Sequence, residues 1–205
     1  MRLYHSQTSP YVRKVMVVAR EAGIHDRIEL IAGSASPVGE TAPVARDNPL
    51  GKLPCLLLQD GGVLYDSRVI CEYLDSQHDG HKLFPAAGPA RWEALRRQAL
   101  GDGMLDFLLV GLSERARPAE QQSSDLKAAL ALKFTMAFDA LEREAAGLEA
   151  SPFGIGHVAI GCACGYADFR YAADDWRKGR PALARWHESF AKRPGYEPTT
   201  HADVY

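Results

Sequence analysis

The stretch that decides the fold is residues 48–74, NPLGKLPCLLLQDGGVLYDSRVICEYL. It contains two short apolar runs, residues 55–59 and 63–65, which are separated by Asp-Gly-Gly. Apolar runs joined through such a turn are typical of a β-hairpin. Asp66 and Ser67 follow at once, and both side chains can accept hydrogen bonds from the free N–H groups at a helix start. The stretch therefore predicts a turn, a hairpin and a helix N-terminus, which attracts anions.

The residues before this stretch predict the rest of a small sheet. Residues 2–5 form a short strand pattern, and a helical pattern begins at Pro10, with Ser9 as its N-cap, and stops at Gly23. Residues 27–31 predict a second strand, and a polar loop follows. A strand–helix–strand unit predicts a parallel pair, and the hairpin adds antiparallel strands. We therefore expect a mixed sheet flanked by helices.

The pattern changes beyond residue 78, where a linker rich in glycine and proline covers residues 79–89. Apolar residues at helical spacing then predict successive helices at residues 91–115, 125–147, 155–173 and 181–192. The third is apolar almost all round, which indicates a buried central helix. We expect the tail beyond residue 194 to be irregular. The predicted domains are residues 1–78, an α+β domain, and residues 90–205, an all-helical domain.

Composition argues against several classes of partner. The chain has 24 Lys and Arg against 26 Asp and Glu, a net charge of −2, whereas nucleic-acid binding usually leaves a basic excess. No apolar run approaches the roughly 18 residues of a membrane span, and the N-terminus lacks a signal-peptide pattern, so we expect a cytoplasmic protein.

His78 and His81 lie in a turn-like segment. The cysteines lack metal-ligand spacing and predict buried apolar residues and no metal site. They are Cys55, Cys71, Cys162 and Cys164.

Several motifs together resemble the cytosolic glutathione transferase family. They are N-P-L-G-K-L-P at residues 48–54, D-S at 66–67, S-P-Y-V-R-K-V at 9–15 and K-L-F-P at 82–85. The likeness covers the whole chain, and segments around residues 115–123 and 165–170 resemble a bacterial, YibF-like branch with a Ser-Pro first helix. The resemblance implies a thioredoxin-like N-terminal domain with a mixed four-stranded sheet, an all-α C-terminal domain and a homodimer.

The resemblance also implies that glutathione is the co-substrate. Leu53 and Pro54 match the family's cis-proline site, where the residue before the proline offers its backbone to the cysteinyl part of glutathione. Asp66 and Ser67 match the pair that holds the γ-glutamyl end. Lys52 either pairs with the glycyl carboxylate or is simply solvated.

Activation of the thiol requires a further group, because an ordinary thiol has a pKa near 8.5 and is mostly protonated at neutral pH. A hydroxyl donor at the positive end of the first helix would stabilise the thiolate. Ser9 is the predicted donor, with Thr8 and Ser6 as alternatives. The first helix does not begin with cysteine, so we do not expect the thiol-transfer chemistry of cysteine-type members.

The expected reaction is glutathione transfer, of the EC 2.5.1.18 type, to a small hydrophobic electrophile, or reduction of a peroxide. The alternative is a non-catalytic member that binds a protein partner or a ligand, as stress-associated and transcription-associated relatives do. The candidates for the electrophile pocket are Tyr11, which lines the pocket or packs on its helix, and four residues of a later helix whose spacing also fits core packing. These four are Met104, Phe107, Leu108 and Gly111.

One departure from the family concerns the start of the buried helix, where relatives often have a Ser/Thr-x-x-Asp capping box. This chain has Gly154 and His157 at those positions. We expect another N-cap or a hydrogen bond from His157 to replace the box.

Overall fold

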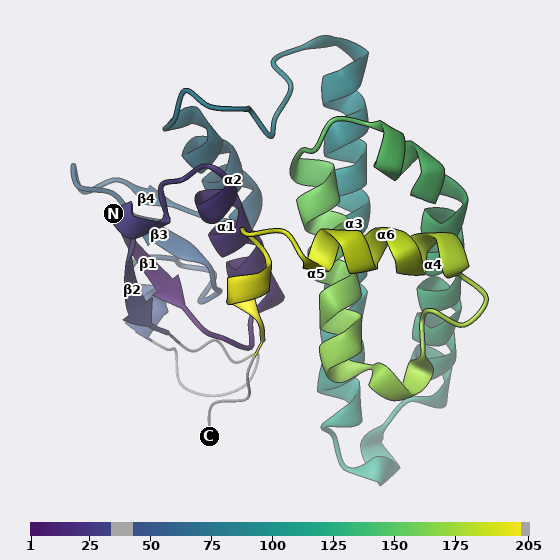
Figure 1. Cartoon of the computed structure of the whole chain (residues 1–205). Coiled ribbons are helices and arrows are strands. Elements are labelled where there is room, and N and C mark those ends of the chain that lie inside the picture. Colours follow the sequence, from purple (N-terminus) through teal and green to yellow (C-terminus); the bar gives the residue numbers. More distant parts are fainter. Residues whose placement is uncertain (34–42, 202–205) are drawn as a thin grey trace. The chain divides into compact units, whose positions relative to one another are not determined.

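The structure is a computed structural model that describes residues 1–33 and 43–201 (Figure 1). Its contacts form two compact units. The first comprises Met1–Arg91 and the segment from Arg193 onward, and the second is Trp92–Lys192. Most of the loop predicted after the second strand lies outside the described residues. Over the described residues, every helix is too short or too polar to traverse a bilayer.

The first unit contains the predicted mixed sheet. Its strands are β1 (Arg2–His5), β2 (Glu29–Ala32), β3 (Cys55–Leu57) and β4 (Val63–Leu64), in the spatial order β2-β1-β3-β4. β1 is parallel to β2 and antiparallel to β3, and β3 pairs with β4 in the predicted hairpin. Both hairpin strands are shorter than predicted, because the chain turns at residues 58–62, where Leu58 donates to the carbonyl of Gly62. The predicted sheet is confirmed.

Two helices of the first unit pack against each other: α1 (Pro10–Glu21) and α2 (Ser67–Ser76). α1 ends where Gly23 adopts a positive φ of 67°, which glycine tolerates at a helix C-terminus. Short 3-10 turns complete this unit, at η1 (His25–Arg27), η2 (Pro43–Arg46) and η5 (Glu197–Thr199). The core between sheet and helices consists of fully buried apolar side chains, among them Leu3, Val15, Leu56, Ile70 and Leu74.

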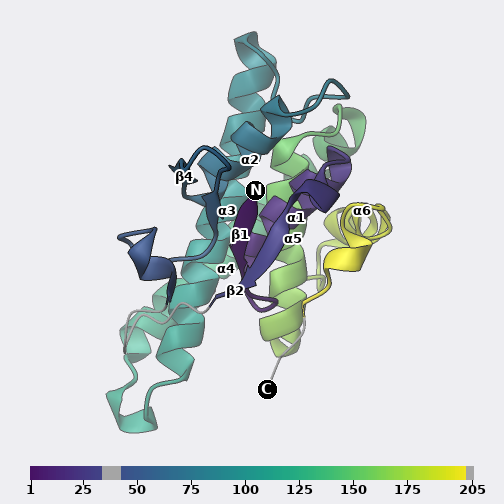
Figure 2. The ribbon, with the colours of Figure 1, turned by 90° about the vertical axis from the view of Figure 1, so that its left-hand side faces the viewer.

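The second unit is helical, as predicted. Its helices are α3 (Gly88–Arg115), of which the part from Trp92 belongs to this unit, α4 (Ser124–Ala150), α5 (Ile155–Arg170) and α6 (Pro181–Ala191). Two 3-10 turns accompany them, η3 (Ala119–Gln121) and η4 (Ala172–Asp174). α6 runs across α4 and α5 in Figure 1 and is seen end-on in Figure 2. All residues of α5 from Ile155 to Ala167 are buried, which confirms the expected central helix.

The start of α5 has the substitute cap expected from His157. Its Nδ1 accepts the backbone N–H of Gly154 at 3.1 Å, and its Nε2 lies 2.9 Å from the carbonyl oxygen of Leu148. Because a carbonyl only accepts, Nε2 carries the proton and donates it. The imidazole thus makes the side-chain-to-backbone bond that the acid of a capping box makes, and also ties α5 to the end of α4.

The C-terminal tail lies along α1. Arg193 pairs with Glu21 at 2.7 Å, and the guanidinium of Arg13 lies 3.8 Å from the ring centroid of Tyr196. Arg13 Nε also donates to Thr199 Oγ1 at 3.2 Å. The predicted helical domain, residues 90–205, includes this tail, whereas the contacts join it to the first unit. Sequence periodicity does not reveal such a long-range contact.

Candidate functional site

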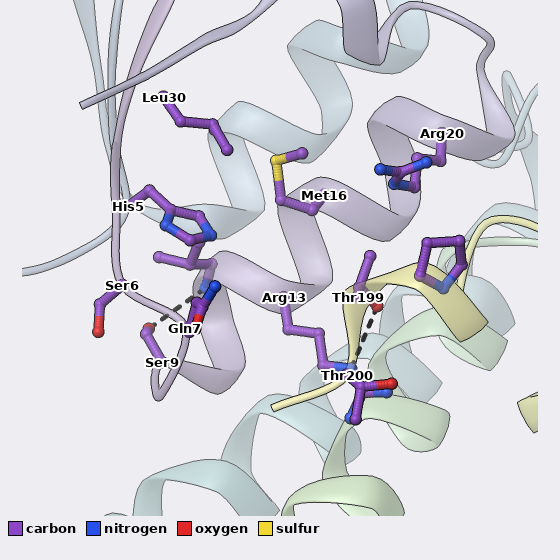
Figure 3. Close-up of a pocket in the computed structure, with 12 residues that line it drawn as sticks. His5, Ser6, Gln7, Ser9, Arg13, Met16, Arg20, Leu30, Thr199 and Thr200 are labelled. Carbon is purple, nitrogen blue, oxygen red and sulfur yellow. Dashed lines mark hydrogen bonds between the residues drawn. The ribbon is translucent and has the colours of Figure 1, made fainter. Parts of the chain in front are cut away.

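The turn that precedes α1 holds Ser9, the predicted thiol activator. Residues 6–9 form a turn in which Ser9 N–H donates to the carbonyl of Ser6 at 3.2 Å. Ser9 is the N-cap of α1, and its Oγ accepts the backbone N–H of Val12 at 3.3 Å (Figure 3). That bond uses a lone pair and leaves the hydroxyl proton for another acceptor. The side chain is thus oriented by the helix while it keeps its capacity to donate.

The two alternative hydroxyls are arranged differently. Ser6 Oγ and Thr8 Oγ1 lie 3.0 Å apart, and Thr8 N–H points at Ser6 Oγ at 3.4 Å. One of these hydroxyls must donate its proton to the other, so the pair has only one proton left for a ligand. Their hydrogen bonding therefore favours Ser9 over Thr8 or Ser6 as the donor.

The turn before β3 is organised by Asn48, which sequence reasoning did not single out. Its side chain is 1% exposed; Nδ2 donates to the carbonyl of Lys52 at 2.8 Å, and Oδ1 accepts Leu50 N–H at 3.0 Å. Gly51 closes the turn onto the carbonyl of Asn48 and has a φ of 61°. An Asn before Pro with Gly three positions later is the signal that could have identified this turn.

Leu53 follows this turn, and the Leu53–Pro54 bond is cis, as predicted. The ladder of β1 and β3 ends at the pair Tyr4 and Cys55, so Leu53 lies just beyond it. Among the described residues, neither the N–H nor the carbonyl of Leu53 has a backbone partner. In this antiparallel register, the residues after Tyr4 and those before Cys55 leave the sheet at the same end. Leu53 and the turn that carries Ser9 therefore share one edge of the first unit.

The start of α2 confirms the predicted helix N-terminus. Asp66 is the N-cap, and its Oδ1 accepts Arg68 N–H at 2.9 Å. Ser67 is the first helical residue and is 3% exposed, whereas Asp66 and Lys52 are exposed. Asp66 thus offers a carboxylate to solvent beside the N–H groups of a helix end. This combination suits a ligand group that carries one positive and one negative charge.

The candidates for an electrophile pocket divide between the two units. In the second unit, Met104 and Leu108 are each 1% exposed. A Cβ at Gly111 would lie 2.5 Å from Tyr171 Oη, which donates to the carbonyl of Leu108 at 2.6 Å. These three residues contribute to the packing of the helical unit. Phe107 and, in the first unit, Tyr11 are half-buried. The pocket remains a prediction.

A cavity of about 190 Å³ borders Ser9 within the first unit. Its walls come from α1, the ends of β1 and β2, and the C-terminal tail, and Figure 3 shows Met16 between His5 and Leu30 on one side and Thr199 on the other. Burial lowers the pKa of His5 and keeps its ring neutral at neutral pH. The sequence did not indicate this cavity, because the tail supplies one wall.

Cysteine, histidine and acidic side chains are the usual protein ligands of a metal ion. The four cysteines are buried thiols that take part in no disulfide, and burial raises the pKa of Cys55 to about 11, so its thiol stays protonated. His78 contacts the buried Asp75 at 3.2 Å. Over residues 1–33 and 43–201, His, Cys, Asp and Glu do not gather into a group that would hold a metal ion.

Comparisons with known proteins agree with this architecture. The family descriptions "Glutathione S-transferase, N-terminal domain" and "Glutathione S-transferase, C-terminal domain" match residues 8–77 and 124–189. A four-stranded thioredoxin-like unit followed by a helical unit is the fold of that class. The chain belongs to the glutathione S-transferase family.

Its relatives include bacterial members. It is 34% identical over 201 residues to the uncharacterized GST-like protein YibF of Escherichia coli K12, across 97% of this chain and 98% of the relative, which confirms the predicted YibF-like branch. A family member from Pseudomonas fluorescens Pf-5, crystallised with bound glutathione, is 42% identical with a TM-score of 0.95, over 98% and 99% of the two chains. A glutathione S-transferase from Methylobacillus flagellatus KT, with glutathione bound, is 34% identical with a TM-score of 0.90, over 98% and 99%.

Proposed function

We propose that this protein is a cytoplasmic glutathione transferase that uses the Ser9 hydroxyl to stabilise the thiolate of glutathione. The observation that supports this assignment is the position of Ser9 at the N-cap of α1, with its proton available for donation. The similar proteins from Pseudomonas fluorescens and Methylobacillus flagellatus contain glutathione in their crystal structures, which supports glutathione as the ligand.

Glutathione would lie along the sheet edge that Leu53 and the Ser9 turn share. The peptide groups of Leu53 would pair with the cysteinyl residue of glutathione as an added strand does. At the α2 N-terminus, backbone N–H groups and Ser67 would receive the γ-glutamyl carboxylate, and Asp66 would receive the ammonium group. Lys52 is the candidate partner of the glycyl carboxylate.

In this mechanism the thiol loses its proton to solvent, and the thiolate forms a C–S bond with a small hydrophobic electrophile while the leaving group departs. Reduction of a peroxide would begin with the same thiolate. Each unit by which the thiol pKa falls requires about 1.4 kcal/mol of selective stabilisation. A donated O–H and the positive end of α1 act on the anion alone, so they supply stabilisation of that kind.

The second candidate is a non-catalytic protein of the same fold. It is favoured by 33% identity over 91 residues, 44% of this chain and 41% of the relative, to a protein named stringent starvation protein A homolog in Pasteurella multocida. Calorimetric titration with glutathione and an assay with a model electrophile distinguish the two. We expect binding and turnover, and the absence of binding at millimolar glutathione would exclude the enzyme.

Ser67→Ala should mainly weaken the binding of glutathione. We expect KM for glutathione to rise at least about tenfold with little change in kcat, because a lost hydrogen bond to a charged group costs about 1.5–3 kcal/mol. Steady-state kinetics with varied glutathione measures both constants. A matched control is Ser76→Ala at the other end of α2, which should leave KM unchanged. An unaltered KM in Ser67→Ala would contradict the proposed placement of the γ-glutamyl group.

We also propose a homodimer, as the family resemblance implies. Large apolar side chains are exposed in both units, including Leu50 at 62% and Trp92 at 69%, and they are available to such an interface. We expect sedimentation to show a dimer and Trp92→Glu to weaken it. A wild-type monomer at micromolar concentration would overturn the proposal.

A further inference from the structure

The C-terminal tail connects the two ends of α1. It begins at the C-terminal end of the helix, where Arg193 Nε and a second guanidinium nitrogen donate to the two carboxylate oxygens of Glu21 at 3.0 and 2.7 Å. It ends, among the described residues, at His201, whose Nδ1 lies 3.0 Å from the carbonyl oxygen of Gln7. The tail therefore reaches the turn that carries Ser9.

The bond from His201 acts on the middle of that turn. Because a carbonyl only accepts, Nδ1 of His201 carries the proton and donates it, and it does so in both the neutral and the charged ring. Gln7 O belongs to the peptide between Gln7 and Thr8, the central peptide of the turn at residues 6–9. The orientation of the central peptide sets the dihedral angles on both sides of it, and hence the direction in which the chain leaves a turn.

A cavity lies between this part of the tail and the turn. The cavity of about 190 Å³ has Thr199 and Thr200 of the tail on one wall and Ser9 on the other (Figure 3). His201 itself is 8% exposed, so water has little access to its bond with Gln7. His201 therefore joins the tail to the turn through a shielded hydrogen bond.

We propose that His201 is a positioning residue for the reaction: it fixes the turn at residues 6–9 so that the Ser9 hydroxyl points at the sulfur of bound glutathione. This role rests on the proposed function. Removal of the His201 bond lets the Gln7–Thr8 peptide rotate, and a small displacement of Ser9 weakens its bond to the thiolate without removing the ligand's other contacts.

The test compares His201→Leu with His201→Asn in the full-length protein with glutathione, because the Asn amide can donate from nearly the same place as Nδ1. For His201→Leu we expect kcat/KM to fall about tenfold near pH 6.5, and the pKa of the bound thiol to rise by about one unit. The loss of kcat/KM should disappear at high pH, where the thiol ionises without the Ser9 hydroxyl. KM for glutathione should change less than about twofold, and His201→Asn should recover most of the activity.

Thr200→Ala is the matched control, since it alters the adjacent tail residue and leaves the His201 bond in place. A purely structural role for His201 predicts a loss that is the same at every pH, and that result would overturn the proposal. So would a thiol pKa that is unchanged in His201→Leu while the wild type binds glutathione normally. Failure of the wild type to bind glutathione would remove the proposed function and this role together.

Discussion

Ser9→Gly should lower kcat/KM for glutathione conjugation by about 100-fold near pH 6.5, because loss of one positioned donor to a developing anion costs about that much. Glycine is the informative replacement. It removes the hydroxyl, yet at an N-cap it costs only a few tenths of a kcal/mol relative to serine, whereas alanine costs about 1 kcal/mol. The fold should therefore survive, and thermal unfolding will verify that it does.

The pH profile identifies the origin of the loss. If Ser9 stabilises the thiolate, the pKa of bound glutathione rises toward the ordinary thiol value in Ser9→Gly. The deficit should then be largest at low pH and shrink above the new pKa, where the thiol ionises without the hydroxyl. Ultraviolet absorbance of the bound thiolate, titrated in wild type and variant, measures this shift directly.

Thr8→Ala and Ser6→Ala are the matched controls, because these hydroxyls lie in the same turn and bond to each other at 3.0 Å. Each should reduce kcat/KM only about threefold or less, through a loosened turn. A full loss in Thr8→Ala with normal activity in Ser9→Gly would reassign the donor to Thr8. Normal activity in all the variants would indicate that the N-terminus of α1, without any hydroxyl, stabilises the thiolate of glutathione.

Gly101→Ala should destabilise the protein by about 3 kcal/mol, the upper end of the usual range for overpacking. Gly101 lies in α3, and a Cβ there would come within 2.5 Å of the backbone carbon of Ala159 and 2.8 Å of Ile160 N, both in α5. Backbone atoms cannot move aside as a side chain does, so the two helices would have to separate. Urea unfolding measures the change in free energy.

Gly103→Ala provides the control in the same helix. A Cβ at Gly103 would meet no atom within 4 Å, so the substitution only replaces a poor helix former with the best one. We expect stabilisation by up to about 1 kcal/mol. Equal destabilisation by both substitutions would show that α3 does not approach α5 at Gly101 as described.

This pair also shows what sequence reasoning could not resolve. Helix propensity treats the two glycines alike, because glycine is a poor helix former wherever it stands in a helix interior. The structure distinguishes them through a neighbour in α5 that is more than 50 residues away along the chain. The hairpin, the Ser9 cap and the Asp66 cap, in contrast, depend on local residue types, and the sequence predicted them correctly.

The same distinction holds for the site. The cis bond before Pro54 and the helix end at Asp66 follow motifs that are continuous in the sequence. Asn48 was overlooked although its turn is local, because a buried amide with two bonds resembles an ordinary polar loop residue in a sequence. The contact of His201 could not be predicted from the sequence, because its partner Gln7 is far away along the chain and the tail carries no periodic pattern.

The return of the tail to α1 has a consequence for biosynthesis. The chain starts the first unit, builds the whole helical unit from Trp92 to Lys192, and only then supplies the residues that lie against α1. Domains usually fold in the order in which they leave the ribosome. Here the helical unit can be complete earlier, whereas the sheet unit receives the contacts of the tail only after Lys192 has been added. A ribosome that stops after Lys192 would therefore release a chain with a finished helical unit and an open face on α1.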